Sequence, residues 1–102
     1  MYRPLPENTT IKKSKIHGLG LFSLYSIDKD INLGISHVKY DSKIFDQGYI
    51  RTALGAFINH SDNPNCNTEE IDGIKYLKTI KKINKDEELT LKYTLYKIGT
   101  LI

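Results

Sequence analysis

The sequence has one cysteine, no tryptophan, two alanines and three prolines among its 102 residues. A single cysteine excludes an internal disulfide and a cysteine-rich zinc cluster. No apolar run reaches the ~20 residues that a membrane-spanning helix needs, and no signal-peptide core lies near Met1. We therefore expect an intracellular, soluble protein with no membrane partner, in the cytoplasm or, for a eukaryotic or viral chain, in the nucleus or host cell.

The charge pattern is mild and gives no nucleic-acid signature. The formal net charge is +3, and the lysines are scattered rather than gathered into a stripe with stacking aromatics. A hydrophobic content of 39% and a charged content of 26% are typical of a folded globular chain. We expect a single domain over residues 1–102, near the lower size limit for a self-sufficient core.

Short strands are the expected secondary structure. Tyrosine, isoleucine and threonine are abundant, alanine is scarce, and breaks rich in Gly, Asn and Asp recur along the chain. The pattern predicts strands over 9–13, 20–27, 74–80 and 89–95, and a half-buried strand in which Ile31, Leu33 and Ile35 point inward. The only helix predicted is a turn or two around 51–57.

The chain contains one short internal repeat. Residues 27–33 and 83–89 share the pattern I-x-K-D-x-x-L. Each copy is typical of a strand end, a tight polar turn and a new strand. Two copies indicate two small sheets with similar edges rather than a solenoid, because a solenoid needs at least three repeats.

The most informative segment is F-I-N-H-S-D-N-P-N-C, residues 57–66. Asn, Asp, Ser and Pro favour turns, because their short side chains bond back to the nearby backbone or fix its conformation. Here they directly follow the apolar residues Ala56, Phe57 and Ile58, which are typical of a core. A polar, turn-rich segment beside the core is costly unless its groups are satisfied, and such segments are commoner at functional sites.

Three segments in order resemble the SET domain family of protein-lysine methyltransferases. They are H-G-L-G-L-F (17–22), F-I-N-H-S-D-N-P-N-C (57–66) and D-E-E-L-T-L-K-Y (86–93). The second is the most specific, and the third has Asp86 where the family usually has glycine. The resemblance covers about residues 9–96. It implies a mainly β fold, the SET-domain β-clip of small curled sheets, with a pseudoknot around the N-H-S segment.

The resemblance also implies an activity, the S-adenosyl-L-methionine-dependent transfer of a methyl group to a lysine amine of a protein or peptide. Tyr93 is then the catalytic tyrosine. The implied cofactor-binding residues are His17, Gly18, Leu19, Gly20, Asn59 and His60. Asn59 and His60 are expected to act through main-chain groups and the Asn59 amide. Lysine is common in the family where His17 stands, and arginine where Ala56 stands.

Two further residues are candidates for the lysine channel. Tyr96 is the expected additional aromatic residue. Thr68 falls where some family members carry a tyrosine that limits how many methyl groups fit. Tyr40 and Tyr49 fit a cofactor or peptide groove and ordinary packing equally well.

The sequence departs from many family members after Tyr93. Only nine residues follow it, without the cysteine-rich zinc segment that closes the lysine channel in those members. We expect no metal, because Cys66 and the histidines lack ligand spacing. Packing of the apolar tail, a homodimer or the substrate itself would then close the channel. A non-catalytic β-clip module that binds a partner protein remains the alternative function.

Overall fold

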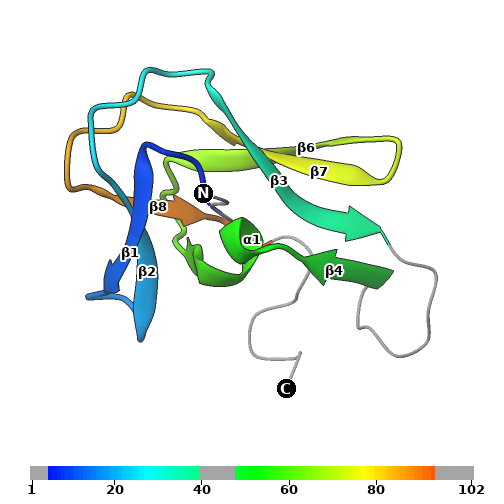
Figure 1. Ribbon diagram of the computed structural model, residues 1–102, viewed down its shortest axis with the longest axis horizontal. Helices are drawn as coiled ribbons and strands as arrows, with labels where there is room; N and C mark the ends of the chain where they lie inside the picture. The colour runs from blue at the N-terminus through cyan, green and yellow to red at the C-terminus, as the bar shows by residue number, and fades with distance from the viewer. Residues whose placement is uncertain (1–4, 40–47, 94–102) are drawn as a thin grey trace.

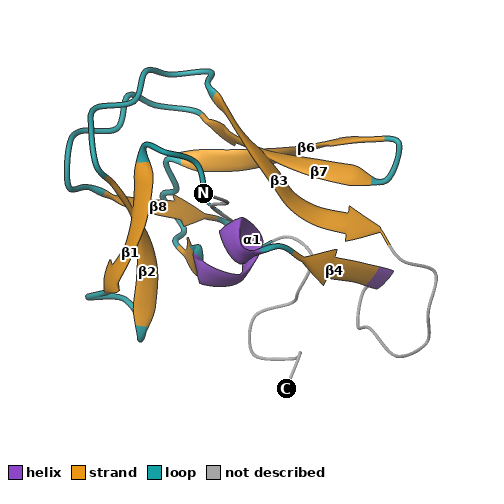
Figure 2. Cartoon of the chain, in the orientation of Figure 1, coloured by secondary structure: helices purple, strands orange, loops and turns teal. Residues whose placement is uncertain are grey.

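A computed structural model describes residues 5–39 and 48–93, and within them the chain is mainly β, as predicted. The described residues form eight strands and one short helix (Figures 1 and 2). The elements are β1 (Thr9–Lys13), β2 (Leu19–Ser23), β3 (Asn32–Lys39), β4 (Tyr49–Arg51), α1 (Ala53–Phe57), β5 (Asn59–His60), β6 (Cys66–Ile71), β7 (Ile74–Thr79) and β8 (Glu88–Leu91).

The strands form one curled sheet. Its order is β1-β2-β8-β6-β7-β3-β4, and β5 pairs with β8 off this path. Figure 1 shows the β1–β2 pair running at a steep angle to the β6–β7 pair, so the sheet bends sharply through β8. This arrangement confirms the predicted fold class of small curled sheets.

Strand β8 is enclosed by the N-H-S segment. His60 in β5 and Cys66 in β6 are both parallel partners of Leu91, so they lie on opposite edges of β8. Residues 60–66 therefore pass from one edge of β8 to the other, which is the predicted pseudoknot. A segment that joins strands on opposite edges of β8 must cross over that strand.

The two copies of the internal repeat form matched turns, as predicted. Ile27 and Ile83 exchange two backbone hydrogen bonds of 2.8 Å, which join the two copies. Asp30 and Asp86 occupy equivalent positions with φ of 66° and 65°. Aspartate tolerates this left-handed conformation better than most residues, and glycine adopts it without strain. The same backbone requirement explains how Asp86 can stand where the family usually has glycine.

The helix lies where it was predicted. The Thr52 side chain caps it by accepting a hydrogen bond from the Gly55 amide, and the helix ends at Phe57, before Ile58, whose backbone is extended. Leu54 and Ile58 enter the core. The core residues are Leu21, Ile27, Leu33, Leu54, Ile58, Cys66, Leu77, Ile83, Leu89 and Leu91.

Three details of the strand prediction were wrong. Ile31 and Ile35 are each 38% exposed. Ile31 lies before β3, and register shifts around Gly34 and Ile35 interrupt the alternation within the strand. Strand β2 ends at Ser23 and β8 ends at Leu91, both earlier than predicted. Strands β4, β5 and β6 were not predicted, although Asp72-Gly73 at the end of β6 forms a two-residue turn with φ of 50° and 80°.

Candidate active site

The Asn59 side chain joins the two motifs that the resemblance assigned to cofactor binding. Its amide nitrogen lies 3.1 Å from the carbonyl oxygen of His17 and 3.2 Å from that of Leu19. A third acceptor, the carboxylate of Glu88, lies 2.9 Å away. Asn59 is buried, so the loop between β1 and β2 is fixed to the core at this point. The amide nitrogen thus donates to the chain's own loop and to Glu88.

The loop itself is a compact turn. The Ser14 amide donates to the Gly18 carbonyl at 2.8 Å, and the Ser14 hydroxyl accepts from the amides of Ile16 and His17. Gly18 has a φ of +46°, and, its two chain neighbours aside, no atom of the described residues lies within 4 Å of the position that a Cβ there would occupy. The exposed backbone of residues 17–19 therefore borders open space, into which a ligand can approach closely.

Tyr93 is held against the N-H-S segment by three contacts. Its hydroxyl donates to the Ile58 carbonyl at 2.8 Å, and its backbone amide donates to Nδ1 of His60 at 3.0 Å. The two rings meet edge to face, with centroids 5.1 Å apart. The half-buried phenol is thus oriented by residues 58 and 60, although Tyr93 is distant from both in sequence.

These contacts also define the tautomer of His60. Because Nδ1 accepts the Tyr93 amide hydrogen, the ring proton must be on Nε2. Nε2 lies 3.0 Å from a carboxylate oxygen of Asp62, which accepts that proton in a hydrogen bond. His60 therefore connects the turn at Asp62 to the backbone at Tyr93, and it orders both.

Asn65 satisfies backbone groups at the edge of β8. Its amide oxygen accepts from the Thr90 amide at 2.8 Å, and its amide nitrogen donates to the Glu88 carbonyl at 2.8 Å. The side chain acts there like one more residue of a neighbouring strand. No buried side-chain nitrogen or oxygen within the described residues lacks a hydrogen-bond partner, so the polar segment is compatible with its place beside the core.

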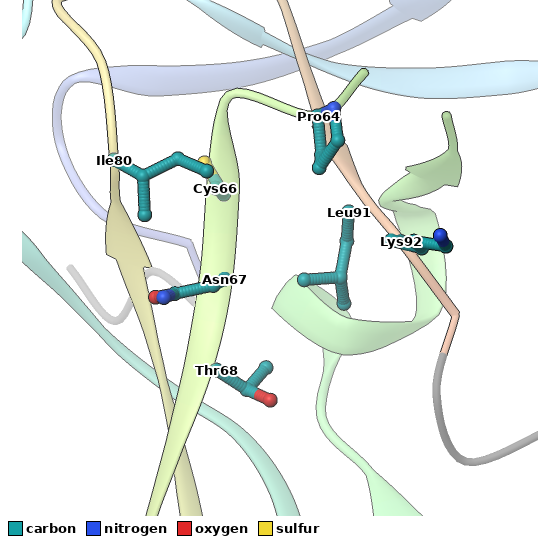
Figure 3. Close-up of a pocket in the computed structure, with 7 residues that line it drawn as sticks. All are labelled: Pro64, Cys66, Asn67, Thr68, Ile80, Leu91 and Lys92. Carbon is teal, nitrogen blue, oxygen red and sulfur yellow. The ribbon is translucent and has the colours of Figure 1, made fainter. Parts of the chain in front are cut away.

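Thr68 borders a pocket of about 160 Å³ at the end of β8 (Figure 3). Thr68 lies on β6, while Leu91 and Lys92 approach from β8 and the residues after it. The remaining lining residues are Pro64, Cys66, Asn67 and Ile80. Leu91 and Lys92, which precede Tyr93 in the sequence, line this pocket together with Thr68.

Cys66 is fully buried, as predicted. Burial, and to a smaller extent the charge of Glu87, raises the pKa of its thiol to about 12. The thiolate is the reactive form of cysteine, so this side chain is unsuited to nucleophilic chemistry. Within the described residues, no group of three or more His, Cys, Asp or Glu side chains is arranged to hold a metal ion.

Tyr49 belongs to a different cluster, at the far end of the sheet. Its hydroxyl donates to Glu70, its ring meets His37 edge to face, and the Lys75 ammonium lies 5.2 Å from its centroid. The Glu70 hydrogen bond is the main cause of a raised Tyr49 pKa. Packing thus accounts for Tyr49. Tyr40 and Tyr96 lie outside the described residues.

Comparison with known proteins agrees with this geometry. The model of the family described as SET domain matches residues 4–94 of the chain. The chain belongs to the SET domain family. Solved SET structures with the same fold include a Plasmodium falciparum protein assigned provisionally as a histone methyltransferase. It has a TM-score of 0.70 and 25% identity, covering 87% of this chain and 95% of that one.

Two further relatives extend the comparison. The methyltransferase domain of human PR domain-containing protein 2 has a TM-score of 0.68 at 20% identity, covering 96% of this chain and 84% of that domain, which supports the fold. The Drosophila melanogaster histone-lysine N-methyltransferase trr is 28% identical over 115 aligned positions. That match covers 84% of this chain and 5% of the Drosophila protein. No helix in residues 5–39 and 48–93 is long and apolar enough to cross a membrane.

Proposed function

We propose that this SET domain transfers a methyl group from S-adenosyl-L-methionine to the amine of a lysine in a protein or peptide. The observation that carries the proposal is the convergence of three separate motifs on β8. Asn59 fixes the loop at residues 17–19, His60 and Ile58 fix Tyr93, and the N-H-S segment encloses the strand between them. A set of side chains this constrained is typical of a site that must hold reactants in alignment.

The loop between β1 and β2 fits the cofactor. Its exposed backbone at His17, Gly18 and Leu19, together with the open space at Gly18, accommodates a ligand that lies close to the main chain. Asn59, which hydrogen-bonds the loop, and the adjacent His60 would form the adjoining wall. The bound cofactor would supply an activated methyl group on a sulfonium, so the protein needs neither a metal nor a nucleophile of its own.

Tyr93 would orient the lysine amine. Its hydroxyl hydrogen is donated to the Ile58 carbonyl, so its oxygen can act as the acceptor for an amine N–H. Lysine in water has a pKa of about 10.4, and a desolvated channel favours the neutral amine that the reaction requires. Holding that amine in line is worth roughly 7 kcal/mol or more of the barrier.

Thr68 would set the width of the channel. Its small side chain borders the pocket near β8, where a tyrosine would occupy part of the space. We propose that this room admits a lysine that already carries one or more methyl groups.

The test is methyl transfer by the wild type and by Tyr93→Phe. With tritiated S-adenosylmethionine and a mixture of lysine-rich proteins, the wild type should label at least one protein. Tyr93→Phe loses the hydroxyl and its acceptor oxygen, so we expect labelling to fall by at least about a hundredfold. Cofactor affinity should change less than about threefold, because the hydroxyl serves the amine.

Two outcomes would contradict the proposed function or the role of Tyr93 in it. Cofactor binding without methyl transfer to any protein would favour a non-catalytic binding module. Equal labelling by the wild type and Tyr93→Phe would remove Tyr93 from the mechanism.

A further inference from the structure

Glu88 lies directly beneath the loop between β1 and β2. Both of its carboxylate oxygens are 2.9 Å from the Ser14 hydroxyl, and one of them is 2.9 Å from the amide nitrogen of Asn59. Glu88 begins β8 and pairs there with Phe22 of β2. The carboxylate is thus presented from a strand in the middle of the sheet. It contacts Ser14 within the loop and Asn59, which holds the loop to the core.

Gly20 leaves the space for this arrangement. A Cβ on Gly20 would lie 2.2 Å from a carboxylate oxygen of Glu88 and 3.1 Å from the amide nitrogen of Asn59. Unlike Gly18, Gly20 is not among the glycines with positive φ. The two glycines of the H-G-L-G motif therefore have different physical roles. Gly18 permits an unusual backbone conformation, and Gly20 makes room for the Glu88–Asn59 hydrogen bond.

The chemistry of the partners requires an acceptor at this position. The Ser14 hydroxyl already accepts from the amides of Ile16 and His17, so its own hydrogen must point to Glu88. The Asn59 amide nitrogen is also a donor. A carboxylate accepts from both, whereas a glutamine amide would turn an NH₂ group toward at least one of these donors.

We propose that Glu88 is a positioning residue for the cofactor loop. Its carboxylate holds Ser14 and Asn59, and through them the backbone at residues 17–19, in the conformation that receives S-adenosylmethionine. This inference rests on the proposed function and deepens it, because it names the group that organises the binding loop without contacting the methyl group or the lysine.

The test compares Glu88→Gln with Glu87→Gln in calorimetric titrations with S-adenosylmethionine. Glu87 is a matched control, because its carboxylate accepts hydrogen bonds from Asn84 and Asn65 and not from the loop. Glu88→Gln should weaken cofactor binding by about tenfold, the equivalent of one hydrogen bond to a charged group. It should raise the KM for the cofactor with kcat changed less than about threefold. Glu87→Gln should lower the melting temperature at least as much as Glu88→Gln does, and it should leave the affinity for S-adenosylmethionine unchanged.

A second pair of variants tests the role of Gly20. Gly20→Ala should weaken cofactor binding by displacing the carboxylate, and its effect should be smaller when Glu88 is already alanine, because the clash is then gone. If Glu88→Gln does not fold, Ser14→Ala removes one of the same hydrogen bonds at the loop surface, and it should weaken binding severalfold.

The failure of this inference is separable from the failure of the proposed function. Wild-type protein that binds the cofactor, with Glu88→Gln binding equally well or weakened only as much as Glu87→Gln, would overturn the positioning role alone. Wild-type protein that does not bind S-adenosylmethionine would overturn both.

Discussion

At the scale of single residues, His37 links folding to pH. It is 4% exposed, and burial, followed by the positive charges of Lys75 and Arg51, lowers its pKa from 6.5 to about 4. Between pH 4 and 6.5, His37 therefore binds a proton in the unfolded chain but not in the folded chain. Stability should be fully present above pH 6.5 and should decrease as the pH falls toward about 4, by at most about 3 kcal/mol.

Urea unfolding across this pH range checks the prediction. His37→Gln keeps a polar side chain beside Ser36 but cannot titrate, so its stability should vary less between pH 6.5 and 4 than that of the wild type. His17→Gln, at an exposed position, is the matched control and should retain the wild-type slope. Equal slopes in all three proteins would show that His37 titrates normally in the folded state.

Cys66 should resist alkylation while the chain is folded. Its thiol is fully buried and has a pKa raised to about 12, so the reactive thiolate is scarce at about pH 8. We expect iodoacetamide to label the urea-unfolded chain completely and the native chain only at the rate of unfolding, as followed by mass spectrometry. Rapid labelling of the native protein would place the thiol at the surface instead.

At the scale of elements, Asn65 stabilises the strand that the pseudoknot encloses. Asn65→Asp preserves the shape of the side chain but replaces its donor with a charged acceptor, facing the Glu88 carbonyl and the Glu87 carboxylate. We expect a loss of about 2–4 kcal/mol of unfolding free energy, the usual cost of an unsatisfied buried group plus a repelled charge.

Asn67→Asp is the matched control for that measurement. Asn67 lies two residues further along the chain, in β6, and is exposed, so the same chemical change should alter stability by less than about 0.5 kcal/mol. Similar losses in the two variants, measured by urea unfolding, would show that Asn65 does not specially support β8.

The sequence predicted elements well where local chemistry decides them. Strand β1 and helix α1 lie where expected, because alternating residues and a capping threonine act locally. The pattern failed in β3, since bulges near Gly34 change the face of each following side chain. The hairpin of β6 and β7 was missed despite the Asp72-Gly73 dipeptide, which was a usable signal.

At the scale of the whole molecule, the path of the chain around β8 could not come from patterning. Hydrophobic alternation identifies strands, but it does not say that residues 60–66 cross from one edge of β8 to the other. Only the resemblance of the motifs predicted the pseudoknot. The resemblance also predicted that His60 and Tyr93 belong to one site, and the two residues are in contact. It indicated no role for Ser14 and Glu88, whose hydrogen bond beneath the loop depends on the folded arrangement.

The curled sheet explains how so short a chain assembles a site. The loop after β1, the N-H-S segment and the end of β8 are distant in sequence, and pairing through β8 brings all three together. A change in any one of them should therefore affect the others, as the proposed Glu88 and Asn65 variants would show.

Calorimetric titration of the wild-type chain with S-adenosylmethionine tests the proposed function most directly. We expect saturable binding of one cofactor per chain, which Tyr93→Phe retains and Glu88→Gln weakens. The absence of any saturable heat from a folded wild-type chain would contradict it.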